Sequence, residues 1–335
     1  MLSHPIALIL KCISMAHRGS LEYWPHRRAQ KLLPRVRNWP ASAEPTIISL
    51  IAFKAGMTHV GITDDSLSPS KGQEITRAAT VMVLPKLFLY GAKFYKKDYL
   101  YRQATGAVYD KTLAQRLGMK NAKSTNFEEA KKKASQYDDV TALVFADPEP
   151  LGIGIKKTLR FEMPVGGKDS AGKLAFIEKF IGKEIKLSEV LSAGDFIDVI
   201  AVSKGRGWEG PVHRFGVARQ YHKSTGKIRH VGTLGAWHPP KVLFSVPMAG
   251  HLGFNYRTEL NKRVLKIGTA QDAESVTPKG GFLHFGTIKN DYLLVDGSIP
   301  GPAKRLIRIR KALRASKKAS APKITFISLT SKQGA

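Results

Sequence analysis

The run Phe196-Ile-Asp-Val-Ile-Ala-Val202 leads into Gly205-Arg-Gly-Trp-Glu-Gly210, and Pro211-Val-His-Arg214 follows directly. The first run has the length and the β-branched composition of a buried strand. The glycines open a tract, residues 204–241, that holds eight Lys or Arg residues, four His and one acid, Glu209. Because such a tract cannot bury enough apolar surface to fold alone, we expect it to extend from a β domain and to take its shape from a partner.

Large rings lie among the cations of this tract, at Trp208, Phe215, Tyr221 and Trp237. Cations neutralise phosphates, flat rings stack on bases, and glycines let the backbone approach a crowded polyanion. The residue types therefore predict structured RNA as the partner.

The charge of the whole chain agrees with a polyanionic partner. Its 335 residues include 54 basic and 26 acidic ones, which gives a net charge of +28 at pH 7. A free-standing basic protein and a membrane-surface protein are the alternatives, but no stretch has the long apolar face that a membrane-surface helix needs. The single cysteine, Cys12, excludes an intramolecular disulfide and a cysteine-rich zinc site, which suits a reducing cytoplasm.

The N-terminal segment has two parts. Residues 1–14 are expected to be an upstream translation extension or a mis-assigned start, because Met15-Ala-His-Arg-Gly-Ser20 resembles a beginning; a short apolar strand is the alternative. Residues 15–45 form a basic arm, which its prolines keep extended and which carries large aromatic rings. A solvent-exposed tail without a binding role is the alternative, but the aromatic rings favour an arm that threads into RNA.

Two series of β-branched and aromatic runs, separated by turn residues, are typical of a barrel or meander. The first series comprises 47–53, 57–63, 75–84 and 87–94, and the second comprises 196–203, 260–267, 282–285, 292–295, 306–309 and 324–329. We expect both series to belong to one closed β unit, residues 46–100 and 191–330, with residues 331–335 as a tail. We expect residues 204–257, which include the basic tract, to be an RNA-binding loop of this unit.

Residues 101–190 are expected to form an inserted α/β module. The stretches 111–117, 127–134 and 173–180 have helical spacing, and 141–145 has the composition of a strand. Residues 126–150 carry six acids against three lysines, so this patch is expected to face solvent or protein rather than RNA.

The C-terminal stretch, residues 303–335, contains ten Lys or Arg residues and no acid. Lys304, Arg305, Arg308 and Arg310 alternate with apolar residues, so we expect one face of a strand on the core and the other on phosphate. A merely solvated charged face is the alternative.

Two patterns resemble enzyme motifs, but each lacks a necessary part. The glycine pattern at residues 205–210 follows a strand, as in dinucleotide-binding folds, yet no acid occurs between Glu209 and Glu259 to bind a ribose. Residues 167–173 resemble a phosphate-binding loop, but Leu174 occupies the place of the magnesium-binding hydroxyl. The histidines show no helical metal pair, and we expect no catalytic or metal site.

The spacing of nine residues resembles the signature of the large-subunit ribosomal protein three family: Leu191, Asp198, Ala201, Ser203, Gly205, Arg206, Gly207, Gly210 and Arg214. Residues 15–28 resemble the archaeal N-terminal arm of that family, and residues 235–258 resemble its long internal loop. Only residues 1–14 fall outside the resemblance.

The resemblance implies a mainly β fold with an α+β insert: a translation-protein-like closed β-barrel with an inserted α/β module, a long basic N-terminal arm and an internal loop. It implies a structural constituent of the large ribosomal subunit in the cytoplasm, which binds the large-subunit (23S-type) rRNA near its 3′ end and nucleates assembly. The resemblance also places Trp237 at the loop tip, near the peptidyl transferase centre. Ribosomal proteins fourteen and twenty-four are the implied neighbours; neither a homo-oligomer nor a membrane protein is implied.

We therefore predict RNA-binding residues in the arm, in the loop and in the strand that follows the loop: His17, Arg18, Trp24, Arg27, Arg28, Arg35, Arg37, Lys204, Arg206, Trp208, His213, Arg214, Arg219, Lys223, Lys227, Arg229, Trp237, His238, Arg257, Lys262 and Arg263. No cofactor is expected, and structural Mg²⁺ and K⁺ enter only through the rRNA. Thr225 stands where eukaryotic relatives carry a modified histidine, so that modification is not expected. An RNA-dependent modification enzyme or an assembly factor is the alternative function.

Overall fold

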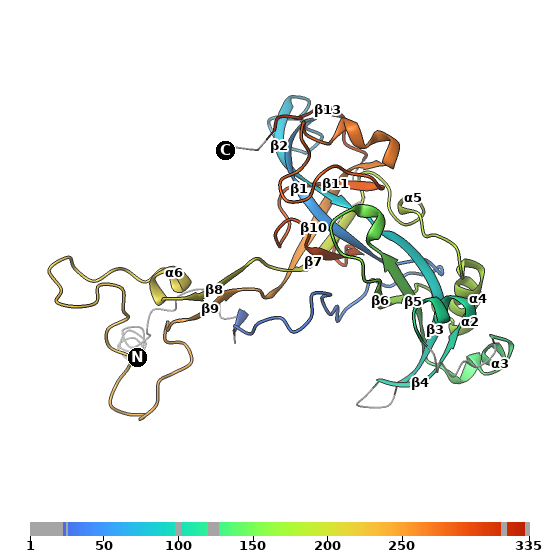
Figure 1. The fold of residues 1–335 in the computed structure, drawn as a ribbon, viewed down its shortest axis with the longest axis horizontal. Helices are drawn as coiled ribbons and strands as arrows, with labels where there is room; N and C mark the ends of the chain where they lie inside the picture. The colour runs from blue at the N-terminus through green and yellow to red at the C-terminus, as the bar shows by residue number, and fades with distance from the viewer. Residues whose placement is uncertain (1–22, 25, 98–101, 120–126, 316–319, 332–335) are drawn as a thin grey trace, which may run out of the picture. The chain divides into compact units, whose positions relative to one another are not determined.

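The computed structural model describes residues 23–24, 26–97, 102–119, 127–315 and 320–331. Strands dominate, and the chain divides into two compact units (Figure 1). The larger unit contains Lys31–Val202 and Tyr256–Ala335; the smaller contains Ser203–Asn255 together with the described residues up to Gln30. The expected mainly β character is confirmed.

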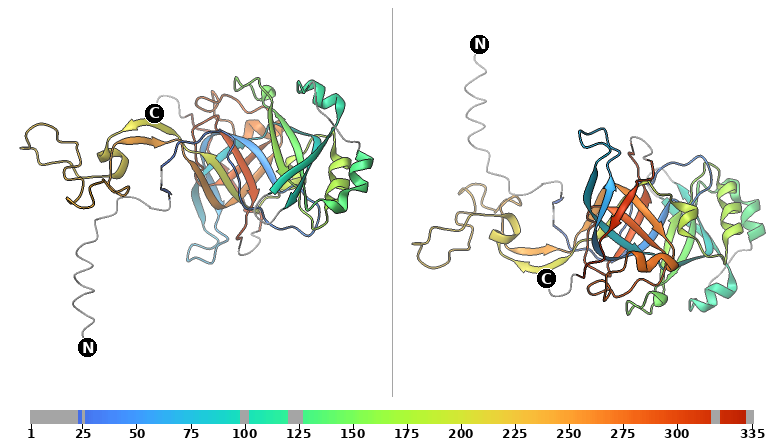
Figure 2. Two further views of the ribbon diagram at one scale, coloured as in Figure 1. Left: turned by 90° about the horizontal axis from the view of Figure 1, so that it is seen from below. Right: turned by 90° about the horizontal axis from the view of Figure 1, so that it is seen from above.

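A seven-stranded antiparallel sheet forms one part of the larger unit, in the order β12-β7-β10-β11-β2-β1-β13. Its strands are β1 (Ser49–Thr63), β2 (Glu74–Val83), β7 (Phe196–Val202), β10 (Tyr256–Gly268), β11 (Tyr292–Asp296), β12 (Leu306–Lys311) and β13 (Ile324–Ile327). Because β12 pairs with β1 as well as with β7, the pairing of six strands returns to its starting strand. In Figure 2 these strands curve around a common interior.

The runs predicted at 47–53 and 57–63 are two halves of one strand, β1. A bulge between Lys54 and Gly56 bends it, so that the first half pairs with β12 and the second with β13. A Cβ at Gly56 would lie 2.4 Å from a ring carbon of Phe282, so only glycine fits at the bend.

A second sheet has the order β4-β3-β5-β6. Its strands are β3 (Lys86–Lys97), β4 (Arg102–Tyr109), β5 (Asp139–Asp147) and β6 (Leu159–Pro164), and the accompanying helices are α2 (Lys111–Arg116), α3 (Phe127–Lys132) and α4 (Ser170–Phe180). Helix α4 packs on β3 and β5 through the buried Leu174 and Ile177. The three predicted helices and the strand at 141–145 are thus confirmed.

Two strand predictions were wrong in their placement. The strand expected at 87–94 exists as β3, but it pairs with β4 and β5 rather than with the seven-stranded sheet, because periodicity shows that a run is buried and not which partner it takes. Residues 282–285 form a turn closed by a bridge between Phe282 and Gly286, with Gly281, His284 and Gly286 at positive φ.

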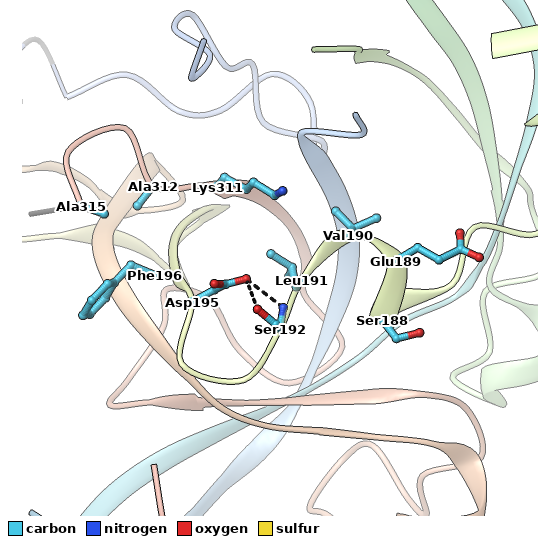
Figure 3. Close-up of a pocket in the computed structure, with 10 residues that line it drawn as sticks. All are labelled: Ser188, Glu189, Val190, Leu191, Ser192, Asp195, Phe196, Lys311, Ala312 and Ala315. Carbon is cyan, nitrogen blue, oxygen red and sulfur yellow. Dashed lines mark hydrogen bonds between the residues drawn. The ribbon is translucent and has the colours of Figure 1, made fainter. Parts of the chain in front are cut away.

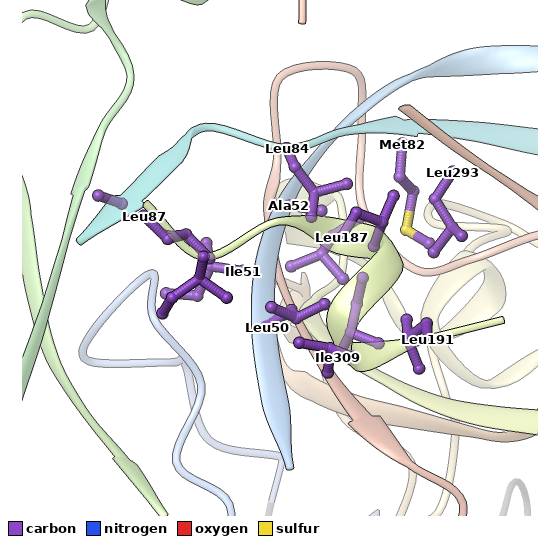
Figure 4. Close-up of a cluster of buried hydrophobic side chains, with 14 of the residues drawn as sticks. Leu50, Ile51, Ala52, Met82, Leu84, Leu87, Leu187, Leu191, Leu293 and Ile309 are labelled. Atoms are coloured by element: carbon purple, nitrogen blue, oxygen red, sulfur yellow. The ribbon is translucent and has the colours of Figure 1, made fainter. Parts of the chain in front are cut away.

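One apolar core joins the two sheets of the larger unit. Leu50 of β1, Met82 of β2 and Leu293 of β11 lie on the same side of β1 as Leu187 of the short helix α5 (Leu187–Val190), whereas Ile51 lies on the other side, toward Leu87 of β3 (Figure 4). Each such side chain contributes about 1.5–3 kcal/mol when it leaves water. The core includes side chains of β7 and β10, the strands that precede and follow residues 203–255 in the sequence.

The smaller unit is built around a two-stranded antiparallel ribbon, β8 (Gly205–Glu209) and β9 (Gly250–Gly253). Hereafter the ribbon means these two strands. Gly253 has φ +75°, and a Cβ there would lie 2.1 Å from the carbonyl oxygen of Lys204, so this crossing requires glycine. Helix α6 (Pro211–Phe215) follows the ribbon and ends after one turn, at the left-handed Gly216.

Candidate nucleic-acid interface

The ribbon presents a large ring and cations to solvent. The side chain of Trp208 is 78% exposed, and Arg206 on the same strand and Lys204 just before it are also exposed. A tryptophan rarely stands in water on a strand unless it meets a partner. Its position opposite His251 in the register fixes the point at which the ring leaves the ribbon.

His213, on α6, lies between two charged side chains of β8. Its Nδ1 is 3.1 Å from Oε2 of Glu209, and its Nε2 is 3.3 Å from Nη1 of Arg206. Gly210 begins α6 and so places Glu209 and His213 four residues apart on adjoining elements. Two predicted RNA-binding residues, Arg206 and His213, are thereby brought into one cluster with Glu209.

Arg214, in contrast, is directed into the smaller unit. Its Nε donates to the carbonyl oxygen of His251 (3.1 Å) and its Nη1 to that of Met248 (2.9 Å), while the guanidinium lies over the Phe215 ring. Burial lowers the pKa of Arg214 from its ordinary value. Arg214 therefore joins α6 to β9, and its role as an RNA contact stays a prediction.

The basic arm contacts the same unit through aromatic rings. Trp24 stacks on Phe215 at 5.5 Å between ring centroids, and Phe244 lies edge-on to it at 5.9 Å. Further along, the Ala29 amide donates to the carbonyl of Phe254 (2.8 Å), and Asn255 donates to the carbonyl of Arg27 (2.8 Å). These contacts place Trp24 against α6 and residues 27–29 against the two residues that follow β9.

Two cations of the arm, Arg27 and Arg28, lie within this attached segment. Arg27 and Arg28 are exposed, and the guanidinium of Arg28 lies 5.3 Å from the centre of the Phe254 ring. His17 and Arg18 fall outside the described residues.

The segment from Gly216 to Ala249 contains most of the remaining predicted residues, and all six of them are exposed: Arg219, Lys223, Lys227, Arg229, Trp237 and His238. Trp237 is 88% exposed. A hydrogen bond from the amide of Gln220 to the carbonyl of Ile228 (3.0 Å) closes the excursion that carries Lys223 and Lys227. The segment thus offers its cations and its largest ring to solvent.

The predicted RNA-binding residues of the larger unit differ in whether they have partners within the protein. Arg35 and Arg37 are exposed, whereas Lys262 lies 3.5 Å from Glu259, and Arg257 donates to the carbonyl of its own neighbour. Arg263 makes a two-pronged contact with the carboxylate of Asp65 and is only 12% exposed.

The contact with Arg263 also changes the ionisation of its partner. The hydrogen bonds from the guanidinium lower the pKa of Asp65 to about 2. Arg263 is thereby engaged inside the protein, and its RNA contact stays a prediction.

Two arginines expected on phosphate are instead buried, so that prediction is wrong. Arg308 is 7% and Arg310 6% exposed. The guanidinium of Arg308 lies 4.8 Å from the centre of the Trp39 ring, and burial lowers its pKa to about 10. Arg310 binds Asp198 and the carbonyl of Asn38. Both arginines therefore tie residues 38–39 to β12.

The sequence alone did not show that Arg308 and Arg310 are buried. Alternation of charged and apolar residues indicates a strand with two faces, but it cannot show that the charged face is covered by segments distant in sequence. A usable signal exists in Asp198, a lone acid inside the apolar run 196–202, because a buried carboxylate requires a cationic partner.

The structure places the two enzyme-like patterns in structural roles. Residues 205–209 are strand β8, and the helix after them has only five residues. Lys173 forms an ion pair with Asp139 at 2.9 Å. Among the described residues, no cluster of three His, Cys, Asp or Glu side chains is placed to hold a metal, and no helix is long and apolar enough to cross a bilayer.

A hollow of about 640 Å³ lies between α5, the turn before β7 and the end of β12 (Figure 3). Inside it, Oδ2 of Asp195 accepts hydrogen bonds from the amide and hydroxyl of Ser192, both 2.8 Å long. This pair closes a tight turn, and the ten lining residues include no histidine or cysteine to activate a nucleophile.

The family model described as "Ribosomal protein L3" matches residues 11–141 and 91–334. The chain belongs to the ribosomal protein L3 family. Proteins named large ribosomal subunit protein uL3 are similar to it over 95% of its length: 38% identical in Methanothermobacter thermautotrophicus, 40% in Methanococcus vannielii and 38% in Methanobrevibacter smithii, with 97% of each relative covered. The resemblance seen in the signature is confirmed.

Membership of the L3 family makes the chain a structural constituent of the large ribosomal subunit and not an enzyme. Some signature residues of this L3 chain have structural roles: Asp198 is buried at 1% exposure, and Gly207 has φ +75° inside the ribbon. Others, such as Arg206, are exposed. The signature thus combines residues that fold the unit with residues that face outward.

Proposed function

We propose that this L3 family member is a primary rRNA-binding protein of the large subunit, and that the smaller unit is its main RNA-binding surface. The observation that carries the proposal is the exposure of Trp208 and Trp237, at 78% and 88%, among exposed cations. Stacking of a base on one such ring contributes about 1–3 kcal/mol. Each neutralised phosphate adds an affinity that falls with salt.

The contacts within the smaller unit support binding with little loss of backbone freedom. The stacking of Trp24 on Phe215 and the hydrogen bonds that Ala29 and Arg27 make with Phe254 and Asn255 hold the arm against α6 and the residues after β9 before any RNA is present. A surface that is already ordered loses less conformational entropy on binding. Cations of the arm and of the ribbon would then meet the rRNA as one surface.

The finer proposal follows the family resemblance. The ring of six paired strands would be a translation-protein-like closed barrel, residues 101–190 its inserted module, and residues 15–45 and 204–257 its RNA-binding arm and loop. The protein would bind near the 3′ end of the large-subunit rRNA, nucleate assembly in the cytoplasm and extend Trp237 toward the peptidyl transferase centre. Ribosomal proteins fourteen and twenty-four would be neighbours, and ions would come with the rRNA.

Binding of in vitro transcribed large-subunit rRNA tests the proposal. Replacement of residues 217–247 by a short Gly-Ser linker is expected to weaken binding at least tenfold, because five exposed Lys or Arg residues and the exposed rings of Tyr221, Trp237 and Phe244 are lost. As a charge control, the exposed Lys111, Arg116, Lys156 and Lys157 of the larger unit are changed together to Ala. If the control weakens binding as much as the loop deletion, the smaller unit is not the main surface.

A further inference from the structure

The cluster of Arg206, His213 and Glu209 admits one arrangement of protons. An arginine guanidinium can only donate, so the Nε2 atom that faces Nη1 of Arg206 at 3.3 Å must accept. An ionised carboxylate can only accept, so the Nδ1 atom that faces Glu209 at 3.1 Å must donate. His213 therefore satisfies both neighbours as a neutral ring with its proton on Nδ1.

Other charged groups beside α6 are engaged elsewhere. Arg214 donates to the carbonyl oxygens of Met248 and His251 on the side of β9. His26 of the arm lies against the Phe215 ring at 5.6 Å. The proton position of His213 is thus set mainly by Arg206 and Glu209.

We propose that Glu209 and His213 together position Arg206 for RNA binding. Glu209 fixes the His213 ring through Nδ1, and Nε2 then holds one Nη atom of an otherwise exposed and flexible side chain. The remaining N–H donors of the guanidinium stay available for a phosphate or a base edge beside Trp208. This inference rests on the proposed function and adds to it His213 as a positioning residue that acts through Arg206.

The test compares two amides at position 213 in the full-length protein. In His213→Gln the amide oxygen reaches the place of Nε2 and can still accept from Arg206. In His213→Asn the shorter amide can serve Glu209 but not Arg206. Against transcribed large-subunit rRNA, we expect His213→Gln to bind within about twofold of the unchanged protein and His213→Asn to bind about 2- to 10-fold more weakly, the effect of ordering one long side chain.

Two further measurements separate positioning from direct contact. In an Arg206→Ala background, His213→Asn is expected to have no additional effect. Nitrogen NMR of the free protein is expected to show the Nδ1–H tautomer of His213 at neutral pH. His284→Asn, the same change on the larger unit, serves as the control and is expected to leave affinity unchanged.

The failures are distinguishable. If Arg206→Ala does not weaken binding, the ribbon is not an RNA contact and the proposed function fails at this site. If Arg206→Ala weakens binding but His213→Asn does not, or if the Nε2–H tautomer is found, only the positioning role is overturned. An additive effect of the two changes would make His213 a direct RNA contact instead.

Discussion

Arg310 on β12 lies directly opposite Asp198 on β7, and the two form an ion pair of 2.9 Å that is almost completely shielded from solvent. The carboxylate also accepts from the backbone amides of Asn261 and Leu313, and the guanidinium donates to the carbonyl of Asn38. One signature residue thus gathers β7, β10, β12 and the segment before β1.

Loss of either partner in this pair is expected to destabilise the larger unit strongly. Arg310→Met or Asp198→Ala leaves a charge buried without its counterpart, at a cost of about 3–5 kcal/mol in the free energy of unfolding. Urea denaturation measures the change. The matched control is Arg77→Met, which breaks the half-exposed pair with Asp296 and is expected to cost at most about 1 kcal/mol. Equal effects would show that burial of the Asp198 pair is unimportant.

The contact between Asp65 and Arg263 is expected to contribute to acid sensitivity. The folded pKa of Asp65 is about 2, below its ordinary 3.8, so its contribution is complete above about pH 4 and disappears as the pH falls toward 2. Because the Asp65 side chain is 37% exposed, solvent screening limits the contribution to about 1 kcal/mol. Asp65→Asn should therefore lose stability at pH 6 and converge with the unchanged protein near pH 2. A constant difference across this range would contradict the pairing.

The arm is expected to detach from the smaller unit when Trp24 is removed. Trp24→Ala abolishes the stacking on Phe215 and the edge contact with Phe244, each worth about 0.5–1.5 kcal/mol. Trypsin cleavage after Arg27 and Arg28 in RNA-free protein should then accelerate about tenfold. Trp237→Ala serves as the control and should leave this cleavage rate unchanged. Equally fast cleavage in the unchanged protein would show that these ring contacts do not hold the arm in place.

Trp237 is expected to matter for function and not for folding. Its side chain is 88% exposed, so Trp237→Ala should leave the melting temperature within about 1 °C of the unchanged protein. In ribosomes that carry the variant, aminoacyl-tRNA binding or peptidyl transfer should be altered, as the proposed loop position requires. A drop of several degrees with normal translation would show instead that Trp237 is a core residue.

Much of the fold follows from the pattern of residues. The β-branched runs at 75–84, 196–203 and 292–295 are strands β2, β7 and β11 in the structure. Consecutive apolar residues place apolar side chains on both faces of a strand, so such a strand must be buried on both faces. β3 was expected in the wrong sheet because pairing depends on contacts between distant residues. The ribbon was not predicted, since the five residues of β8 include two glycines and have little strand propensity, and their pairing partners Gly250, His251 and Gly253 lie far along the chain.

The candidate site was predictable in composition and only partly in geometry. Arg206, Trp208 and Trp237 are exposed as an RNA-binding role requires. Arg214 and Arg263 were predicted as RNA contacts on the same grounds. In the fold, however, Arg214 donates to backbone carbonyl oxygens and Arg263 pairs with Asp65. Charge in a sequence cannot show which cations find partners inside the protein, because those partners lie far along the chain.

Ultraviolet crosslinking of large subunits that contain the protein, followed by mass spectrometry of the crosslinked peptides, tests the RNA-binding surface most directly. We expect RNA adducts at Trp208, at Trp237 and on residues 23–30, because these carry the exposed rings and cations of the smaller unit. Adducts confined to the four-stranded sheet of the larger unit, with none on these three regions, would contradict the proposal that the smaller unit is the main RNA-binding surface.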